Sequence, residues 1–181
     1  VTASGTFGTA QNITISMPAI DGDFNIVYDD ATNQIIVMCR ALDSGLGAYK
    51  LHAGVISNSA GTFTVNTFYA QTNGNNVEFG SNLTYDSTNS RYIVVSRNNL
   101  GTILGTSFTI SGTTITWDSN TANSSYAAQS TKGIGIAYTD EYDRCLVTCS
   151  GDSAQSYYPI AQIFYYNGST PTWHNNFWTL Q

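Results

Sequence analysis

Apolar residues in this chain come in short runs that are separated by polar, turn-forming residues. Three runs are nearly continuous: IIVMCR from Ile35, YIVVSR from Tyr92 and CLVTCS from Cys145. No segment keeps apolar residues at helical spacing for more than about a turn. The runs are rich in Val, Ile, Thr, Tyr and Phe and end at Gly, Asn, Asp or Ser, which is typical of β-strands and their turns. The pattern predicts an all-β protein.

One segment of this pattern occurs three times. Residues 24–40 read FNIVYDDATNQIIVMCR, residues 82–97 read NLTYDSTNSRYIVVSR, and residues 135–150 read GIAYTDEYDRCLVTCS. When the copies are aligned on Tyr28, Tyr85 and Tyr138, each becomes a short apolar run, a turn and a second apolar run. The spacing of about 55 residues is a structural repeat, and such repeats bury their apolar faces by stacking on one another.

Each repeat predicts four antiparallel strands. The first strand ends at the tyrosine, and the second is apolar throughout, as expected of a strand buried on both faces. A third and a fourth strand follow, joined by a turn that contains glycine. Four short strands in about 50 residues are the signature of a β-propeller blade. The sequence therefore predicts a single repeat domain over residues 1–181: a β-propeller-like array of three four-stranded antiparallel blades, at 14–71, 72–120 and 121–181, with an orphan N-terminal strand at 1–13.

Three blades are too few to close a ring, and the orphan strand is surplus. The chain is therefore expected to be a piece of a longer array, or to close or stack with other chains.

The composition limits the kinds of molecule that the protein is expected to bind. Charged residues make up only 10% of the chain and the net charge is −6, with no cluster of basic residues. Binding to nucleic acid depends on basic clusters, so that class is set aside. No run approaches the roughly 20 apolar residues of a membrane span. A surface covered by Ser, Thr, Asn, Gly and Tyr is instead typical of extracellular or virion β-proteins.

The cysteines and acids predict no cofactor and no metal centre. Cys145 and Cys149 share one face of a strand about 13 Å apart, too far for a disulfide, and Cys39 lies in another repeat. All three are expected to be reduced core residues. No His or carboxylate spacing matches a metal site, and most acids fall in turns, where Asp stabilises its own backbone.

The repeat unit resembles one found in structural proteins of marine and environmental bacteriophages. The resemblance rests on YDDATNQIIV, YDSTNSRYIV, SNSAGTFTV and SGTTITW, and the third copy departs from it at Thr139 and Ser150. Such repeats commonly occur in tail fibres and other virion-surface proteins and look like propeller blades. The resemblance implies a virion-surface module that is used in adhesion or particle decoration.

Two arginines are candidate ligand-binding residues. Arg40 and Arg97 end the second strand of two repeats at the same position. A guanidinium offers a rigid fork of donors to a carboxylate or to sugar hydroxyls. The alternative is that each arginine forms an ion pair or a hydrogen bond inside its own repeat.

Aromatic residues form the second group of candidates. Trp117 and Trp173 lie near the end of a repeat, where they can stack on sugars or pack between blades. Tyr157 and Tyr158 belong to a denser group near the C-terminus that also holds Tyr165, Tyr166, Trp173, Phe177 and Trp178. This group predicts a carbohydrate site, a cap or, as the preferred interpretation, an interface to another subunit.

No catalytic residue is assigned, because His52 and His174 lie in no nucleophile motif and no G-x-S-x-G occurs. Residues 112–118, GTTITWD, also lack the Asp-box spacing of propeller sialidases. The sequence predicts a non-enzymatic virion-surface structural or adhesion protein. Its expected partners are other virion subunits or further copies of the chain, and a host glycan. The alternative is a secreted or cell-surface lectin, or an extracellular filament subunit.

Overall fold

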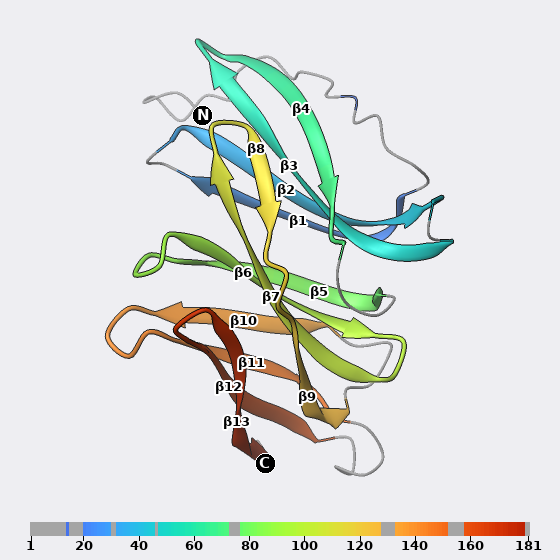
Figure 1. The fold of residues 1–181 in the computed structure, drawn as a ribbon, viewed down its shortest axis with the longest axis vertical. Coiled ribbons are helices and arrows are strands. Elements are labelled where there is room, and N and C mark those ends of the chain that lie inside the picture. Colours follow the sequence, from blue (N-terminus) through green and yellow to red (C-terminus); the bar gives the residue numbers. More distant parts are fainter. Residues whose placement is uncertain are drawn as a thin grey trace.

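The computed structural model describes residues 14, 20–29, 32–45, 47–72, 77–127, 133–151 and 158–179. These residues contain no helix and form three antiparallel sheets that follow one another along the long axis of the molecule (Figure 1). The prediction of an all-β, propeller-like array is confirmed. The orphan strand predicted at residues 1–13 lies outside the described residues.

Each sheet corresponds to one repeat and is called a blade here. The first blade runs in chain order through β1 (Ile20–Asp29), β2 (Gln34–Asp43), β3 (Ala48–Ser59) and β4 (Thr62–Ala70). The second holds β5 (Val77–Asp86), β6 (Arg91–Asn98), β7 (Thr102–Ser111), β8 (Thr114–Trp117) and β9 (Ala122–Ala127). The third holds β10 (Ile134–Thr139), β11 (Arg144–Ser150), β12 (Pro159–Asn167) and β13 (Thr170–Thr179).

The fifth strand of the second blade is the second half of an interrupted fourth strand. β8 pairs with the end of β7 and β9 pairs with its beginning. The fourth strand is irregular in the other blades too, since the register shifts opposite Val55 in the first and opposite Ile163 in the third. Residues 122–127, which the repeat pattern assigns to the third blade, therefore pair within the second.

The turn between the first two strands of each blade has one repeated conformation. Asn33, Ser90 and Asp143 occupy the same repeat position and have φ angles of 53°, 52° and 49°. Asn and Asp tolerate this left-handed region better than most residues. In the second blade, the Asp86 carboxylate accepts the Asn89 backbone N–H at 2.9 Å. The expectation that these acids stabilise their own turns holds there.

The core lies between the blades. On β6, Tyr92 and Val94 face the first blade, whereas Ile93 and Val95 face the third, and all four are at most 3% exposed. Strict alternation along a strand puts neighbouring side chains on opposite faces. β6, the second strand of the middle blade, therefore contributes to two hydrophobic clusters, which explains its continuous apolar run.

Two kinds of polar contact repeat at the junctions between blades. The indole N–H of Trp117 donates to the Tyr69 carbonyl of the first blade at 2.8 Å, and that of Trp173 donates to the Ala122 carbonyl of the second at 3.0 Å. The side-chain amide of Asn25 donates to the Ser81 carbonyl, and that of Asn82 to the Ile134 carbonyl, each at 3.0 Å. Equivalent residues thus set the spacing of both junctions.

The three cysteines are buried and form no disulfide, as the sequence predicts. Burial raises the pKa of the Cys39 and Cys149 thiols to about 11 and that of the Cys145 thiol to about 12. For Cys145, the nearby carboxylates of Asp86 and Asp143 add to this effect.

Because the thiolate is the reactive form, the native protein should react negligibly with a disulfide reagent at pH 8, well below these pKa values. Unfolding should expose all three thiols to the reagent. Thiol titration with and without guanidinium measures both states. Rapid labelling of the native protein would contradict the buried placement.

Gly105 should not tolerate a side chain, because the Phe164 ring of the third blade lies over it. An added Cβ would approach Phe164 Cε2 to 2.3 Å. Overpacking of this kind costs about 1–3 kcal/mol, so Gly105→Ala should lower the midpoint of urea unfolding. Gly133→Ala is the matched control, because nothing lies within 4 Å of a Cβ added there. Equal midpoints for the two variants would contradict this packing.

Candidate functional site

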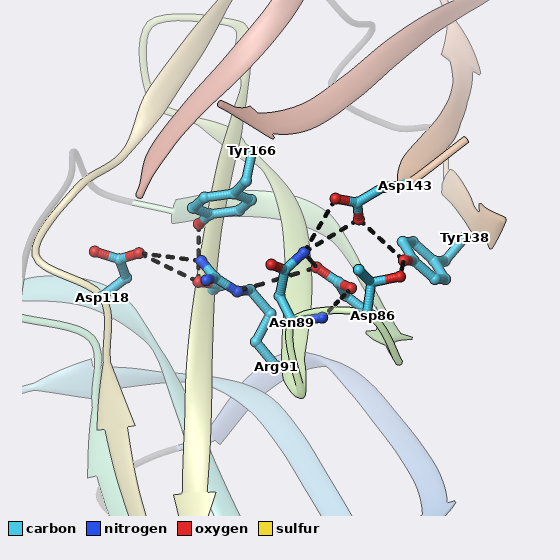
Figure 2. A network of polar contacts seen from close by, with 9 residues as sticks. Asp86, Asn89, Arg91, Asp118, Tyr138, Asp143 and Tyr166 are labelled. Atoms are coloured by element: carbon cyan, nitrogen blue, oxygen red, sulfur yellow. Dashed lines mark hydrogen bonds and ion pairs between the residues drawn. The ribbon is translucent and has the colours of Figure 1, made fainter. Parts of the chain in front are cut away.

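A cluster of polar side chains joins the second and third blades at the turn end of the sheets (Figure 2). The Arg91 guanidinium lies 4.3 Å from the centroid of the Tyr166 ring. Its nitrogens lie 4.0 Å from a carboxylate oxygen of Asp86 and of Asp118. The Tyr166 hydroxyl donates to the Ser107 hydroxyl at 2.8 Å. The Arg91 guanidinium of β6 thus packs against the Tyr166 ring of the third blade.

The same cluster continues through two aspartates. The Asn89 side-chain amide donates to Asp86 at 3.0 Å and to Asp143 of the third blade at 3.1 Å. The Tyr138 hydroxyl contacts the Thr88 hydroxyl at 2.7 Å and donates to Asp143 at 3.0 Å. A single amide therefore bridges two carboxylates that belong to different blades.

These contacts hold the side chains of the cluster to one another. Burial raises the pKa of the Tyr138 and Tyr166 hydroxyls to about 12, so neither exchanges a proton near neutral pH. Asp86 is 1% exposed and its two oxygens accept hydrogen bonds from Asn89. The side chains bond to one another across the junction, which leaves them little freedom to bind a substrate.

A second polar region is open to solvent. A pocket of about 430 Å³ lies on the third blade and is called the β12–β13 pocket. It is lined by Tyr165, Thr172, Trp173, His174, Asn175 and Asn176. An aromatic ring beside several groups that both donate and accept hydrogen bonds is a common composition for a site that binds a small polar molecule.

The pocket exists because β13 bulges. Gln162 pairs with Phe177 and Phe164 with Trp173, so residues 174–176 face Ile163 alone. The side-chain amide of buried Gln162 donates to the His174 carbonyl at 2.7 Å, and Ser124 of β9 donates to the Gln162 side-chain oxygen at 2.6 Å. Buried hydrogen bonds that start in the second blade therefore hold the bulge in place.

The orientation of His174 follows from one contact inside the bulge. The Asn176 backbone N–H donates to His174 Nδ1 at 3.2 Å. A neutral imidazole that accepts at Nδ1 carries its proton on Nε2. On the neighbouring strand, the Arg144 guanidinium lies 5.1 Å from the centroid of the Tyr165 ring. The pocket thus offers an oriented N–H, amide groups and an aromatic ring close to a cation.

The two predicted arginines hold the structure together. Arg40 is 5% exposed, donates from Nε to the Val77 carbonyl of the second blade at 2.9 Å, and stacks on Tyr49. Arg97 forms an ion pair with Glu78 of its own blade. The Arg97–Glu78 pair and the stacking of Arg40 on Tyr49 correspond to the predicted alternative of a contact inside the repeat, whereas the Arg40 hydrogen bond to Val77 crosses to the next blade. Neither arginine lines the β12–β13 pocket.

The predicted aromatic residues separate into different places. Trp117 and Trp173 pack between blades through their indole N–H groups, although Trp173 also lines the β12–β13 pocket. Tyr158 is 47% exposed and is not among the residues that line this pocket. Tyr157 lies outside the described residues. Of the five predicted residues that the structure describes, Trp173 lines the pocket.

Sequence reasoning missed most of the pocket. In the sequence His174 is an isolated histidine, and the neighbouring asparagines read as ordinary strand residues. The run of His and two Asn directly after a Trp on an edge strand is the signal that could have indicated a bulge, since such residues interrupt regular strand patterning.

Two further classes of site can be assessed within the described residues. No group of three or more His, Cys, Asp or Glu side chains there is arranged to hold a metal ion. Nor do these residues include a helix long and apolar enough to cross a membrane.

Comparisons with known proteins add one structural likeness. No family model matches the chain, and no curated protein matches it in sequence. Among solved structures, it is similar to a fucose lectin from Kordia zhangzhouensis in complex with methyl-fucoside. The identity is 14% and the TM-score 0.46, over 87% of this chain and 100% of that one. At this level of likeness, the assignment of a site depends on the geometry of the chain itself.

Removing the Tyr166 hydroxyl should weaken the junction between the second and third blades. Tyr166→Phe keeps the ring beside Arg91 but loses the hydrogen bond to Ser107, and a typical intramolecular hydrogen bond contributes about 0.5–1.5 kcal/mol. Urea unfolding measures the loss. Tyr142→Phe is the control, because Tyr142 is 65% exposed. A Tyr166→Phe variant as stable as the control would show that the hydrogen bond from Tyr166 to Ser107 does not stabilise the junction.

Proposed function

We propose that this protein is a non-enzymatic adhesion module that binds neutral glycans in the β12–β13 pocket. The observation that carries the proposal is the composition of this pocket, in which the Tyr165 ring lies beside the imidazole and amide groups of the β13 bulge. The scaffold around it consists of three blades joined by buried contacts.

A sugar ring can contact both the aromatic ring and the polar groups of the pocket. One side of a pyranose presents C–H groups, which pack against an aromatic face, whereas its edge presents hydroxyls that donate and accept hydrogen bonds. Asn175 and Asn176 can do both, and the N–H on His174 Nε2 can donate. Planar polar groups favour a ligand that has several hydroxyls over a purely apolar one.

The charge of the chain favours a neutral ligand. Its net charge is −6, which repels anionic glycans at long range. An open pocket of this size binds a monosaccharide weakly, so adhesion would depend on several copies acting together through effective concentration.

The place of adhesion remains a proposal from the resemblance of the repeats to those of bacteriophage structural proteins. A virion surface fits a rigid β-scaffold that presents the same pocket many times. A secreted or cell-surface lectin is the alternative, and its pocket would do the same chemistry.

Binding of immobilised glycans, followed by calorimetry with the corresponding methyl glycosides, tests the function. Tyr165→Ala should weaken binding of the best neutral ligand by about tenfold or more, which corresponds to about 1.4 kcal/mol. His174→Ala should also weaken it, because it removes the oriented N–H. Tyr142→Ala is the control, since this tyrosine is exposed on the β10–β11 turn and does not line the pocket.

Two results would refute the proposal. One is the absence of binding to any neutral glycan by the folded protein. The other is binding whose affinity is unchanged in both pocket variants, which would place the ligand elsewhere on the molecule.

A further inference from the structure

The third blade exposes an apolar residue that the other blades bury. Ile36, Ile93 and Leu146 occupy the same position, eight residues after the repeat tyrosine. Ile36 and Ile93 are 0% and 2% exposed because the next blade covers them, whereas Leu146 is 44% exposed. The outer face of the third blade therefore carries half of a blade junction. Trp178 of β13 is also exposed, at 49%.

The first blade exposes the part of the complementary half that its first strand carries. Ile26, Leu83 and Ile136 share the position two residues before the repeat tyrosine. Leu83 is 5% exposed and Ile136 is partly buried, because each packs against the preceding blade. Ile26 is 60% exposed, and Phe24 and Tyr28, on the same face of β1, are 50% and 58% exposed.

The exposed part of the first blade is confined to its first strand. On the same outer face, Val37 and Cys39 of β2 are fully buried. Within the array, the first strands of successive blades lie against each other, β1 against β5 and β5 against β10. The strip along β1 is therefore the exposed part of this outer face that a second copy can cover.

We propose that a second copy of this chain covers these two surfaces, with the third blade of one copy stacked on β1 of the other. The contact is head-to-tail. The buried counterparts of Leu146 pack against the following blade, and the buried counterparts of Ile26 pack against the preceding blade. Two copies supply two such junctions and six blades. Propellers typically have about 4–8 blades, so two copies close a ring, whereas three would exceed this range.

This junction differs chemically from the junctions inside the chain. Gly135 stands where Asn25 and Asn82 donate to the next blade, and Val65 stands where Trp117 and Trp173 donate to the preceding one. Both repeated polar contacts are therefore missing, and the contact between copies is apolar.

Light scattering coupled to size-exclusion chromatography tests this inference on the full chain over a range of concentrations. The wild type should elute with twice the chain mass of 19.5 kDa. Ile26→Asp and Leu146→Lys should each give a monomer, since an unpaired charge in an apolar interface opposes association. A variant that carries both substitutions should recover the dimer, because each junction would then bring an introduced carboxylate opposite an introduced ammonium group.

Leu100→Asp is the matched control. Leu100 is 69% exposed in the β6–β7 turn and lies on neither outer face. This variant should remain dimeric, and circular dichroism should show that all variants keep the native fold, since every changed residue is exposed.

Four outcomes would overturn the inference. They are a monomeric wild type at every concentration, an assembly larger than a dimer, a dimer that only one of the two single substitutions disrupts, and a double variant that remains monomeric. None of these outcomes changes the test of glycan binding, which is measured on the pocket variants whatever the oligomeric state.

Discussion

The structure depends on the burial of both faces of β6, the second strand of the middle blade, between its two neighbouring blades. Ile93 and Val95 of β6 pack against the third blade, while Tyr92 and Val94 pack against the first. Burying a side chain of this size contributes about 1.5–3 kcal/mol, and no blade can bury both faces by itself. A single blade would therefore leave half of its core in water, so the blades are stable as a stack rather than as separate units.

Apolar packing alone does not set the distance and angle between blades. The indole N–H of Trp117 and of Trp173 must reach a particular backbone carbonyl in the preceding blade, and the amides of Asn25 and Asn82 must reach one in the next. A buried donor left without an acceptor costs free energy. These contacts select one arrangement among the many that apolar surfaces allow.

The positions where the repeat breaks its own pattern are the ones that give the molecule distinct ends. Thr139 replaces the turn aspartate of the other copies, and Asn89 of the second blade instead reaches Asp143, four residues further along. Val65 and Gly135 remove the polar contacts at the two ends of the stack. The bulge of residues 174–176 opens the β12–β13 pocket on the last blade. Divergence within a regular scaffold thus gives the end blades surfaces that differ from the junctions inside the stack.

The strands, the repeat and the buried cysteines could be predicted from the amino-acid sequence, because they depend on local patterning and turn chemistry. The continuous run from Ile35 to Arg40 indicates burial on both faces without any knowledge of the partner. The residues that each side chain contacts depend instead on how the three blades pack together. Arg91 gave no signal in the sequence, yet it lies beside Tyr166, a residue 75 positions away in the chain. The pocket was equally hidden, because its shape depends on a register shift in β13 that Gln162 and Ser124 stabilise from other strands.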